Sequence, residues 1–358
     1  MTKSGGGQAL HAAGLTEHLR REGYRVRLLP IDPEFPAGAG WVRRVPYLRT
    51  VLNQSLYLPS LLRLRESNIV HVSSASYWSF LIAPLPAMIM GRLLGKPVIL
   101  NYHSGEAADH LARWGVLVHP WLSLADEIVV PSDYLRQVFA SHGYRTRVIH
   151  NTVDTSRFAY RVRDPLRPRL LSTRNFEWYY GVDQTLQAFK LIQRTYPDAT
   201  LDIAGAGSRE RELRALARSL DLTGVRFLGA VAPSDMPALH DRSDILINSS
   251  LIDNQPLSIL EAMASGMPIV STETGDIVNM IEHGISGTIV PQKDPAAMAA
   301  AVVSLLMDPD GARAMASRAV GRLDRYSWNR VGSQWSALYS EMMQGRPSER
   351  PGGVRHAA

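Results

Sequence analysis

The chain of 358 residues contains no cysteine, which excludes disulfide bonds and thiolate-ligated metal sites. It also has no long hydrophobic run. The longest apolar stretch, 78–90, is shorter than the roughly 20 residues of a membrane-spanning helix, and two prolines interrupt it. We therefore expect a buried element there. No secretion signal is recognisable at the start, so together with the missing cysteine we expect a cytoplasmic protein.

Acidic residues are absent from the stretch 35–65, which is rich in apolar and aromatic residues. Its arginines are Arg43, Arg44, Arg49, Arg63 and Arg65. The first 165 residues carry 19 Lys and Arg against 12 Asp and Glu, and the remainder carries 20 against 21. This segment either lies on an anionic surface, such as the inner face of a membrane or an anionic acceptor, or forms a solvated helix face over the core. Without a recognisable binding module, we expect no nucleic-acid partner.

Short β-branched runs alternate with amphipathic stretches of helical length, which indicates parallel sheets crossed by helices. The predicted strands are 25–29, 69–72, 97–102, 127–130 and 147–149, followed by 169–172, 200–204, 225–228, 245–248, 268–271 and 287–290. Helices are expected over 8–22, 183–196, 209–220 and 258–265. The two series meet in an arginine- and proline-rich stretch, 154–168, which is typical of a linker.

The sequence therefore predicts an α/β protein of two domains. The first domain spans 1–165 and the second spans 166–326. A helix over 327–343 and a disordered tail over 344–358, rich in Gly, Pro, Ser and Arg, complete the chain.

The stretch 253–268, DNQPLSILEAMASGMP, carries the strongest chemical signal. Pro256 presets a turn, and a helix follows whose first free amides, on Leu257 and Ser258, can hold a phosphate. Glu261 lies one turn into this helix, where it can accept hydrogen bonds from two ribose hydroxyls, and Asp253 can reach an attached sugar. Taken alone, such a stretch is more often a helix cap with a solvated acid.

The longer stretch 253–276, DNQPLSILEAMASGMPIVSTETGD, resembles the signature of retaining glycosyltransferases of the GT-B fold, family 4. In that family two acids separated by seven residues frame a proline and precede an alanine-rich helix. The resemblance implies that Glu261 holds the ribose hydroxyls and that Asp253 contacts the transferred sugar. It also implies that the amides of Leu257 and Ser258 hold the pyrophosphate.

Other motifs follow in the order of the family across nearly the whole chain. Gly5 to Gly7 resembles its glycine loop, which implies that Gly6 and Gly7 approach the donor phosphates. The stretch 101–105 resembles the loop whose histidine, here His103, faces the reacting carbon. Seen alone, the glycines fit a flexible start and His103 fits a satisfied turn histidine.

In the second half, Arg174 occupies the place of the family's phosphate-binding arginine. Gly205 and Gly207 occupy the place of its glycine-rich strand end. Outside this context, Arg174 is read as a surface ion-pair residue, and the two glycines fit a tight turn equally well. The order of the motifs favours the functional interpretation.

Two positions depart from the family pattern. The family usually has a lysine just before a glycine on the loop of Arg174, where this chain has Tyr180 before Gly181. A tyrosine donates a hydrogen bond but carries no charge at neutral pH. The first acid of the signature is Asp253, one methylene shorter than the usual glutamate, and Asn254 follows where glycine is common. These changes affect the expected choice of sugar more than the chemistry.

The resemblance implies two Rossmann-like domains that face each other across a cleft, with the helix over 327–343 crossing back to the first domain. Five apolar residues of this helix lie on one face: Trp328, Val331, Trp335, Leu338 and Tyr339. Family members open with a buried strand before the glycine loop, and residues 1–4 cannot form one. We therefore expect the natural protein to begin upstream of Met1.

The function implied is transfer of a sugar from a nucleotide-sugar, which is a substrate, to an acceptor hydroxyl with retention of configuration. No metal and no cofactor are expected. The acceptor is a glycan, a lipid-linked molecule or a small molecule. Two alternatives stay open: a sugar-nucleotide epimerase of the same fold and a catalytically idle nucleotide-sugar-binding module. Turnover of a labelled donor, compared with binding alone, separates all three.

Overall fold

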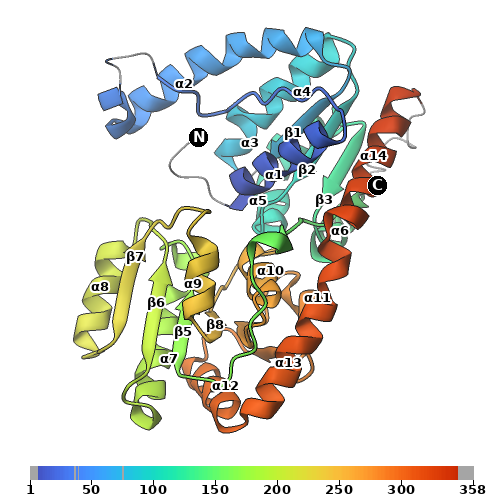
Figure 1. Ribbon diagram of the computed structural model, residues 1–358. Helices are drawn as coiled ribbons and strands as arrows, with labels where there is room; N and C mark the ends of the chain where they lie inside the picture. Colours follow the sequence, from blue (N-terminus) through green and yellow to red (C-terminus); the bar gives the residue numbers. More distant parts are fainter. Residues whose placement is uncertain (1–6, 36–37, 39, 75, 346–358) are drawn as a thin grey trace, which may run out of the picture. The chain divides into compact units, whose positions relative to one another are not determined.

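A computed structural model describes residues 7–35, 38, 40–74 and 76–345 (Figure 1). Gly5, Gly6 and the predicted tail beyond 345 lie outside the described residues. The chain divides into two compact units. The N-terminal unit contains Gln8–Ile149 together with the chain from Gly332 onward, and the C-terminal unit contains His150–Val331. Each unit is an α/β structure built on one parallel sheet, as the sequence predicts.

The sheet of the N-terminal unit has the order β1-β2-β3-β4, and all its pairs are parallel. Its strands are β1 (Val70–Ser74), β2 (Val98–Tyr102), β3 (Glu127–Val130) and β4 (Arg147–Val148). Its helices are α1 (Gly7–Arg21), α2 (Pro46–Ser60), α3 (Trp78–Ile82), α4 (Pro84–Leu93), α5 (Ala107–Leu122) and α6 (Asp133–Ser141), with short 3₁₀ turns at Gly40–Arg44 and Leu61–Glu66.

Strand β2, with the sequence VILNY, is buried at every position, as expected for a parallel strand covered on both faces. Leu100 and Tyr102 belong to the core on one face, and Ile99 and Asn101 point to the other because side chains alternate along a strand. The apolar stretch 78–90 supplies α3 and most of α4 to the same core through Phe80 and Met88. The predicted buried element is confirmed only in part, because Phe80 and Met88 are buried whereas Trp78 and Ile82 are 67% and 39% exposed. No helix among the described residues is long and apolar enough to cross a bilayer.

The predicted strand over 25–29 does not form. The segment has no regular secondary structure, and the Val26 carbonyl accepts hydrogen bonds from Nε and Nη2 of Arg20 at 3.2 and 2.8 Å. A strand needs a neighbouring backbone to pair with, and none of the described strands lies along 25–29. Side-chain hydrogen bonds thus replace the ladder that the β-branched composition predicts.

The sheet of the C-terminal unit has six parallel strands in the order β10-β9-β8-β5-β6-β7. The strands are β5 (Arg169–Ser172), β6 (Thr200–Ala204), β7 (Val225–Gly229), β8 (Ile245–Asn248), β9 (Ile269–Thr272) and β10 (Thr288–Val290). The helices are α7 (Val182–Thr195), α8 (Glu210–Ser219), α9 (Met236–Arg242), α10 (Leu257–Ala264), α11 (Ile277–Met280), α12 (Pro295–Met307) and α13 (Pro309–Gly321), with 3₁₀ turns at Thr155–Arg157, Trp178–Tyr180 and Leu323–Tyr326.

The order of the strands reverses at β5. From β5 the chain builds β6 and β7 on one side and then returns to place β8, β9 and β10 on the other. Ligands of open α/β sheets bind outside the carboxyl ends of the strands at such a switch point. The loops after β5 and β8 therefore define the place where a ligand of this unit is expected.

The boundary between the units lies earlier than the predicted one at 165/166. The reason is Arg163, which is 1% exposed and is bound by the C-terminal unit. Its guanidinium donates to the carbonyls of Ser265, Arg161 and His240, the last two at 2.7 and 3.0 Å. The end of the predicted linker is thus packed on the C-terminal unit. The buried side chain of Arg163 holds it there.

The last helix, α14 (Trp328–Met343), returns to the N-terminal unit, as predicted. Trp335 is buried with its ring 4.9 Å from that of His71 on β1. Glu341 accepts a hydrogen bond at 2.7 Å from Arg147 of β4. The apolar face read from the sequence is the face that packs.

Candidate functional site

The candidate site of the C-terminal unit lies at the switch point of its sheet. Arg174 follows β5, the Asp253 loop follows β8, and Gly205 follows β6 directly. These three strands are neighbours in the sheet and run parallel, so their carboxyl ends meet at one edge. The structure thereby brings together predicted residues that lie up to 79 positions apart in the chain.

The Arg174 guanidinium is buried and held by two polar neighbours. Its Nε donates to Oδ1 of Asn248 at 2.7 Å, and its Nη2 lies 2.8 Å from Oδ2 of Asp253. Asn248 is fixed in turn, because its Nδ2 donates to the hydroxyl of Ser271 at 2.8 Å and its Oδ1 also accepts from Ser250. A cation on a buried, fully oriented support is a preorganised binding group for phosphate.

Tyr180 stands where the family usually has a lysine, and it contacts Arg174 with its ring. The Arg174 guanidinium carbon lies 5.4 Å from the centre of the Tyr180 ring, within the range of a cation–π contact. The following residue, Gly181, has a φ of 59° and packs so closely that a Cβ would meet the Ser249 carbonyl at 2.3 Å. Where the family usually has a second cation, this chain therefore has an aromatic ring, Tyr180, that contacts the guanidinium of Arg174.

Glu261 is a carboxyl group with an unusual environment. Its side chain is 17% exposed, and burial raises its pKa to about 7 against the opposing charges of Arg157 and Arg174. Oε2 lies 4.0 Å from Nε2 of His240, whose pKa burial lowers to about 4. This imidazole is neutral at pH 7 and does not neutralise the carboxylate. A buried acid without a counterion in direct contact is typical of a ligand site.

Helix α10 begins as the sequence predicts. Pro256 is its N-cap in an extended conformation, with φ −71° and ψ 126°, and Leu257 is the first helical residue. The first amides of a helix have no partner within it, and its dipole favours an anion there. The hydroxyl of Ser258 is buried and has no hydrogen-bond partner among the described residues. The helix start thus holds donors that a bound phosphate can satisfy.

The loop before this helix is fixed by a contact that the sequence does not reveal. Oε1 of Gln255 accepts from the Asn151 amide at 2.5 Å, and its Nε2 lies 2.9 Å from Nδ1 of His150. On the other side, a Cβ at Gly275 would meet the Asp253 carbonyl at 2.2 Å, so only glycine fits there. Asp253 is thereby held in place against Arg174.

Gly205 and Gly207 have a packing role in this structure. A Cβ at Gly205 would lie 2.0 Å from the Arg174 carbonyl, and one at Gly207 would lie 2.6 Å from the Phe176 carbonyl. The Phe176 amide also donates to the Ala206 carbonyl at 3.1 Å. These glycines let the loop after β6 lie against the loop that carries Arg174. Their predicted contact with the donor is untested, and the tight turn that the sequence leaves as the alternative is present.

His103 lies in the N-terminal unit, directly after β2, and its amide donates to the Ser74 carbonyl at 3.3 Å. Nε2 of His103 and both side-chain polar atoms of Asn101 are buried without a partner in the part of the chain that the structure describes. Gly7, the one described residue of the glycine motif, begins α1. His103 thus lies on a unit separate from Arg174 and Glu261.

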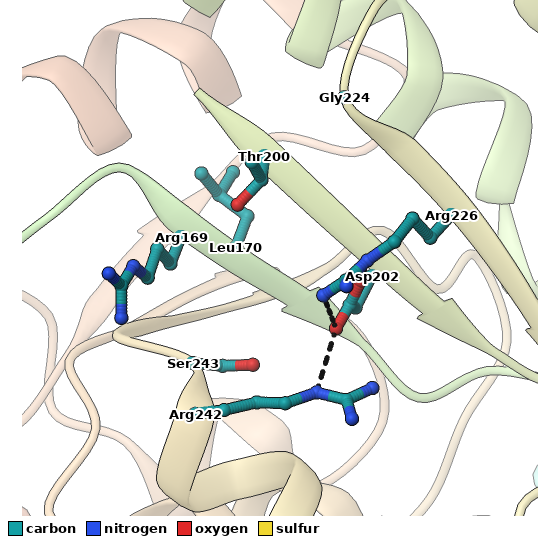
Figure 2. Close-up of a pocket in the computed structure, with 8 residues that line it drawn as sticks. All are labelled: Arg169, Leu170, Thr200, Asp202, Gly224, Arg226, Arg242 and Ser243. Carbon is teal, nitrogen blue, oxygen red and sulfur yellow. Dashed lines mark hydrogen bonds and ion pairs between the residues drawn. The ribbon is translucent and has the colours of Figure 1, made fainter. Parts of the chain in front are cut away.

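A second charged cluster lies elsewhere on the C-terminal sheet (Figure 2). Asp202 of β6 accepts two hydrogen bonds from Arg226 at 2.6 and 2.8 Å and one from Arg242 at 3.1 Å. It lines a cavity of about 340 Å³ with Arg169, which begins β5. Because Arg169 and Thr200 are the first residues of their strands, this cavity lies toward the amino edge of the sheet, away from Arg174. We interpret it as a structural ion-pair cluster.

Sequence reasoning missed three residues of the site. Asn248, Gln255 and Arg157 support Arg174, the Asp253 loop and the charge of Glu261, respectively. The only available signal was for Asn248, a polar residue at the end of a strand that is otherwise apolar. The described residues contain no group of three or more His, Asp or Glu side chains arranged to hold a metal.

Two family models match the chain. The model described as "Glycosyl transferases group 1" matches residues 167–308, and the model described as "Glycosyltransferase Family 4" matches residues 5–157. Together they span most of the chain.

Among curated proteins, a glycogen synthase of Mycobacterium tuberculosis is 29% identical over 76% of this chain and 70% of its own. A phosphatidyl-myo-inositol mannosyltransferase of Mycobacterium leprae is 25% identical over 93% and 92%. Among solved structures, Anabaena HepE, crystallised with UDP and glucose, shares the fold with a TM-score of 0.73 at 18% identity, over 95% of this chain and 97% of its own.

The pKa of Glu261 predicts a pH-dependent stability. The folded state holds its proton up to about pH 7, whereas the free side chain loses it near 4.5, so the folded state binds more protons between these values. Stability therefore falls as the pH rises through this window, by about 3 kcal/mol in total. Glu261→Gln removes this cost. In chemical denaturation without ligand, the Glu261→Gln variant should have a higher free energy of unfolding than the wild type at pH 8. At pH 4.5 the two should differ little.

The exposed Glu273 provides the matched control, because Glu273→Gln should have no effect at either pH. A Glu261→Gln variant less stable than the wild type at pH 8 would show that the carboxylate is not strained by burial.

Proposed function

Because the chain belongs to the group 1 glycosyltransferases, we propose that it transfers a sugar from a nucleoside diphosphate to an acceptor hydroxyl with retention of configuration. The observation that carries this proposal is the arrangement of Arg174, Glu261 and the start of α10 at the switch point of the C-terminal sheet. The three groups have the chemistry that a diphosphate and a ribose require.

The diphosphate is bound by charge and by backbone donors. The amides of Leu257 and Ser258 and the unpartnered Ser258 hydroxyl donate to its oxygens at the positive end of α10. Arg174 supplies the positive charge, held in place by Asn248 and by the Tyr180 ring. As the bond to the sugar breaks, negative charge grows on the departing diphosphate, and these donors stabilise it most at that point.

Glu261 binds the ribose. An ionised carboxylate accepts two hydrogen bonds, which matches the pair of hydroxyls on a ribose ring. Hydrogen bonds from these hydroxyls stabilise the charged form, so donor binding is expected to lower the pKa of this carboxyl from its raised value. Burial destabilises the Glu261 carboxylate in the free protein. A ligand with two ribose hydroxyls relieves this destabilisation, and a ligand without them does not.

Asp253 and His103 contact the transferred sugar. Oδ2 of Asp253 lies 2.8 Å from Nη2 of Arg174, and Oδ1 accepts from the Asn254 amide at 2.9 Å. A sugar hydroxyl donates to a remaining lone pair of this carboxylate. The acceptor hydroxyl attacks the anomeric carbon on the face from which the diphosphate leaves. The new bond joins that carbon to the acceptor oxygen, the bond to the diphosphate oxygen breaks, and the hydroxyl proton passes to the leaving diphosphate.

The donors named here require no divalent cation. Turnover measured with EDTA in excess should therefore equal turnover with added Mg²⁺ or Mn²⁺. A strict requirement for either ion would contradict this mechanism.

The exposed side of α2 is proposed to bind an anionic membrane surface. Tyr47, Val51 and Leu48 of this helix are 88%, 65% and 42% exposed, whereas Tyr57 on the opposite side is buried and donates to the Ala83 carbonyl at 2.8 Å. Arg49 is also exposed. The helix thus covers the core with one side and presents apolar and basic side chains with the other, which suits a bilayer interface.

Glu261→Gln tests the ribose contact. The amide presents donors where the site needs acceptors, so turnover of the preferred donor should fall at least tenfold, a loss of about 1.4 kcal/mol or more. The measurement is kcat/KM with a panel of UDP-, GDP- and ADP-sugars. Glu273→Gln should keep the wild-type value, and a Glu261→Gln variant with more than a tenth of it would refute the assignment.

Arg174→Ala removes the only cation that we place on the diphosphate. A charged hydrogen bond contributes about 1.5–3 kcal/mol, so kcat should fall by roughly ten- to more than a hundredfold. Tyr180→Lys should restore part of this loss in the double variant, because it returns a cation to the place the family uses. Tyr180→Phe, which keeps the ring, should stay close to the wild type. A loss under about threefold for Arg174→Ala would mean that another cation binds the phosphates.

Vesicle cosedimentation tests the membrane surface. The protein should bind phosphatidylglycerol vesicles and not phosphatidylcholine vesicles, and salt should weaken this binding. Changing Arg49, Arg63 and Arg65 to Gln removes about 1 kcal/mol per charge. Changing the exposed Arg167, Arg211 and Arg218 of the C-terminal unit to Gln provides a matched control. Equal binding by the two triple variants would reject the assignment.

A further inference from the structure

Three histidines far apart in the sequence meet on one face of the N-terminal sheet. His11 lies on α1, His71 on β1, and His103 directly after β2. His11 is on the buried side of its helix, since Leu15 and Leu19, four and eight residues further on, are buried as well. The rings of His11 and His103 are in contact, with centroids 4.8 Å apart and planes at 51°.

Four ring nitrogens of this cluster have no partner among the described residues. Both ring nitrogens of His11, Nε2 of His71 and Nε2 of His103 are buried without a hydrogen-bond partner among the described residues. Buried polar groups in folded proteins are nearly always paired. A histidine that only filled space in the core would have a fixed partner for at least one nitrogen, as His110 has in the Tyr102 hydroxyl at 2.7 Å.

The far end of the cluster is anchored by the last helix. Nδ1 of His71 lies 2.9 Å from the Tyr339 hydroxyl, and its ring packs 4.9 Å from that of Trp335. Tyr339 in turn packs against Tyr24. The titratable groups that the described residues place against these rings are thus the three imidazoles themselves and the phenol of Tyr339.

Burial and mutual repulsion both disfavour a proton on these rings. Burial lowers the pKa of His11 to about 4 and that of His71 to about 3, and His11 contributes to the second shift. The pKa of His103 is lowered well below its usual value by burial first and then by His11 and His71. All three imidazoles are therefore neutral at pH 7.

We propose that His11 is a positioning residue for His103. Its ring packs on the His103 ring, excludes water from it, and holds it as the neutral imidazole that faces the transferred sugar. A neutral ring can both donate to and accept from a sugar hydroxyl, whereas a protonated ring can only donate. This inference rests on the proposed function, because it takes His103 as the residue that contacts the sugar.

The test is a pH titration of His103 by NMR in the full-length chain labelled with ¹³C-histidine, with the signal assigned by its loss in His103→Ala. In the wild type, the titration midpoint of His103 should lie well below 6.5, because the ring is buried. His11→Ala lets water reach the ring, so the His103 midpoint should rise toward 6.5. His11→Phe keeps the ring contact and should leave the midpoint low.

Turnover at saturating donor should depend on the protonation of His103. The kcat of His11→Ala should therefore fall between pH 8 and pH 6, while that of His11→Phe does not. His11→Asn, which also admits water, replaces His11→Ala if the latter does not fold. His110→Phe, a change at a buried histidine outside the cluster, should leave the His103 midpoint unchanged.

An unshifted midpoint in both His11→Ala and His11→Asn would overturn the inference. The proposed role of His103 is tested separately, since full turnover by His103→Ala would refute that role whatever the midpoints are.

Discussion

The buried contact between Arg174, Asn248 and Asp253 is the constraint on which the candidate site depends. It joins the loop after β5 to the end of β8 and to the loop beyond it, across the place where the strand order reverses. Breaking a buried pair by removing one partner leaves an uncompensated charge, which is strongly destabilising. The contact that joins these loops therefore also fixes the orientation of the Arg174 guanidinium. The glycines at 205 and 275 serve this contact, because they let neighbouring loops approach the backbone of Arg174 and Asp253.

Around this fixed cation, the protein keeps groups that it does not satisfy by itself. Glu261 is largely buried with a raised pKa, and the Ser258 hydroxyl has no partner within the described ranges of the chain. In the N-terminal unit, His11, Asn101 and His103 show the same property. Unpaired buried groups cost stability, and natural proteins retain them where a ligand completes the pairing. Both units thus carry buried polar groups that the described residues leave unpaired, at or near residues that the family resemblance selects.

Much of the fold could be predicted from the sequence, because parallel strands buried on both faces read as short β-branched runs. Strands β5, β6 and β8 lie where the pattern places them, and α14 begins one residue after the predicted start and ends at the predicted residue. The segment 25–29 shows the limit of this signal, since composition does not reveal whether a pairing partner is present. Of the site, the helix start at Leu257 and its acid were readable from local pattern. The contacts of Asn248 and Gln255 were not, because they join residues 74 and 104 positions apart. The contact between the Tyr180 ring and Arg174 could not be predicted either, because it depends on the conformation of the loop that carries both residues.

The most direct measurement is a crystal structure of the full chain with the nucleoside diphosphate that its preferred donor contains. The diphosphate should contact the Arg174 guanidinium and the amides of Leu257 and Ser258, and both ribose hydroxyls should donate to Glu261. A diphosphate bound in the cavity beside Arg169 and Asp202, or one that leaves the Arg174 guanidinium and the start of α10 free, would contradict the assignment of the donor site.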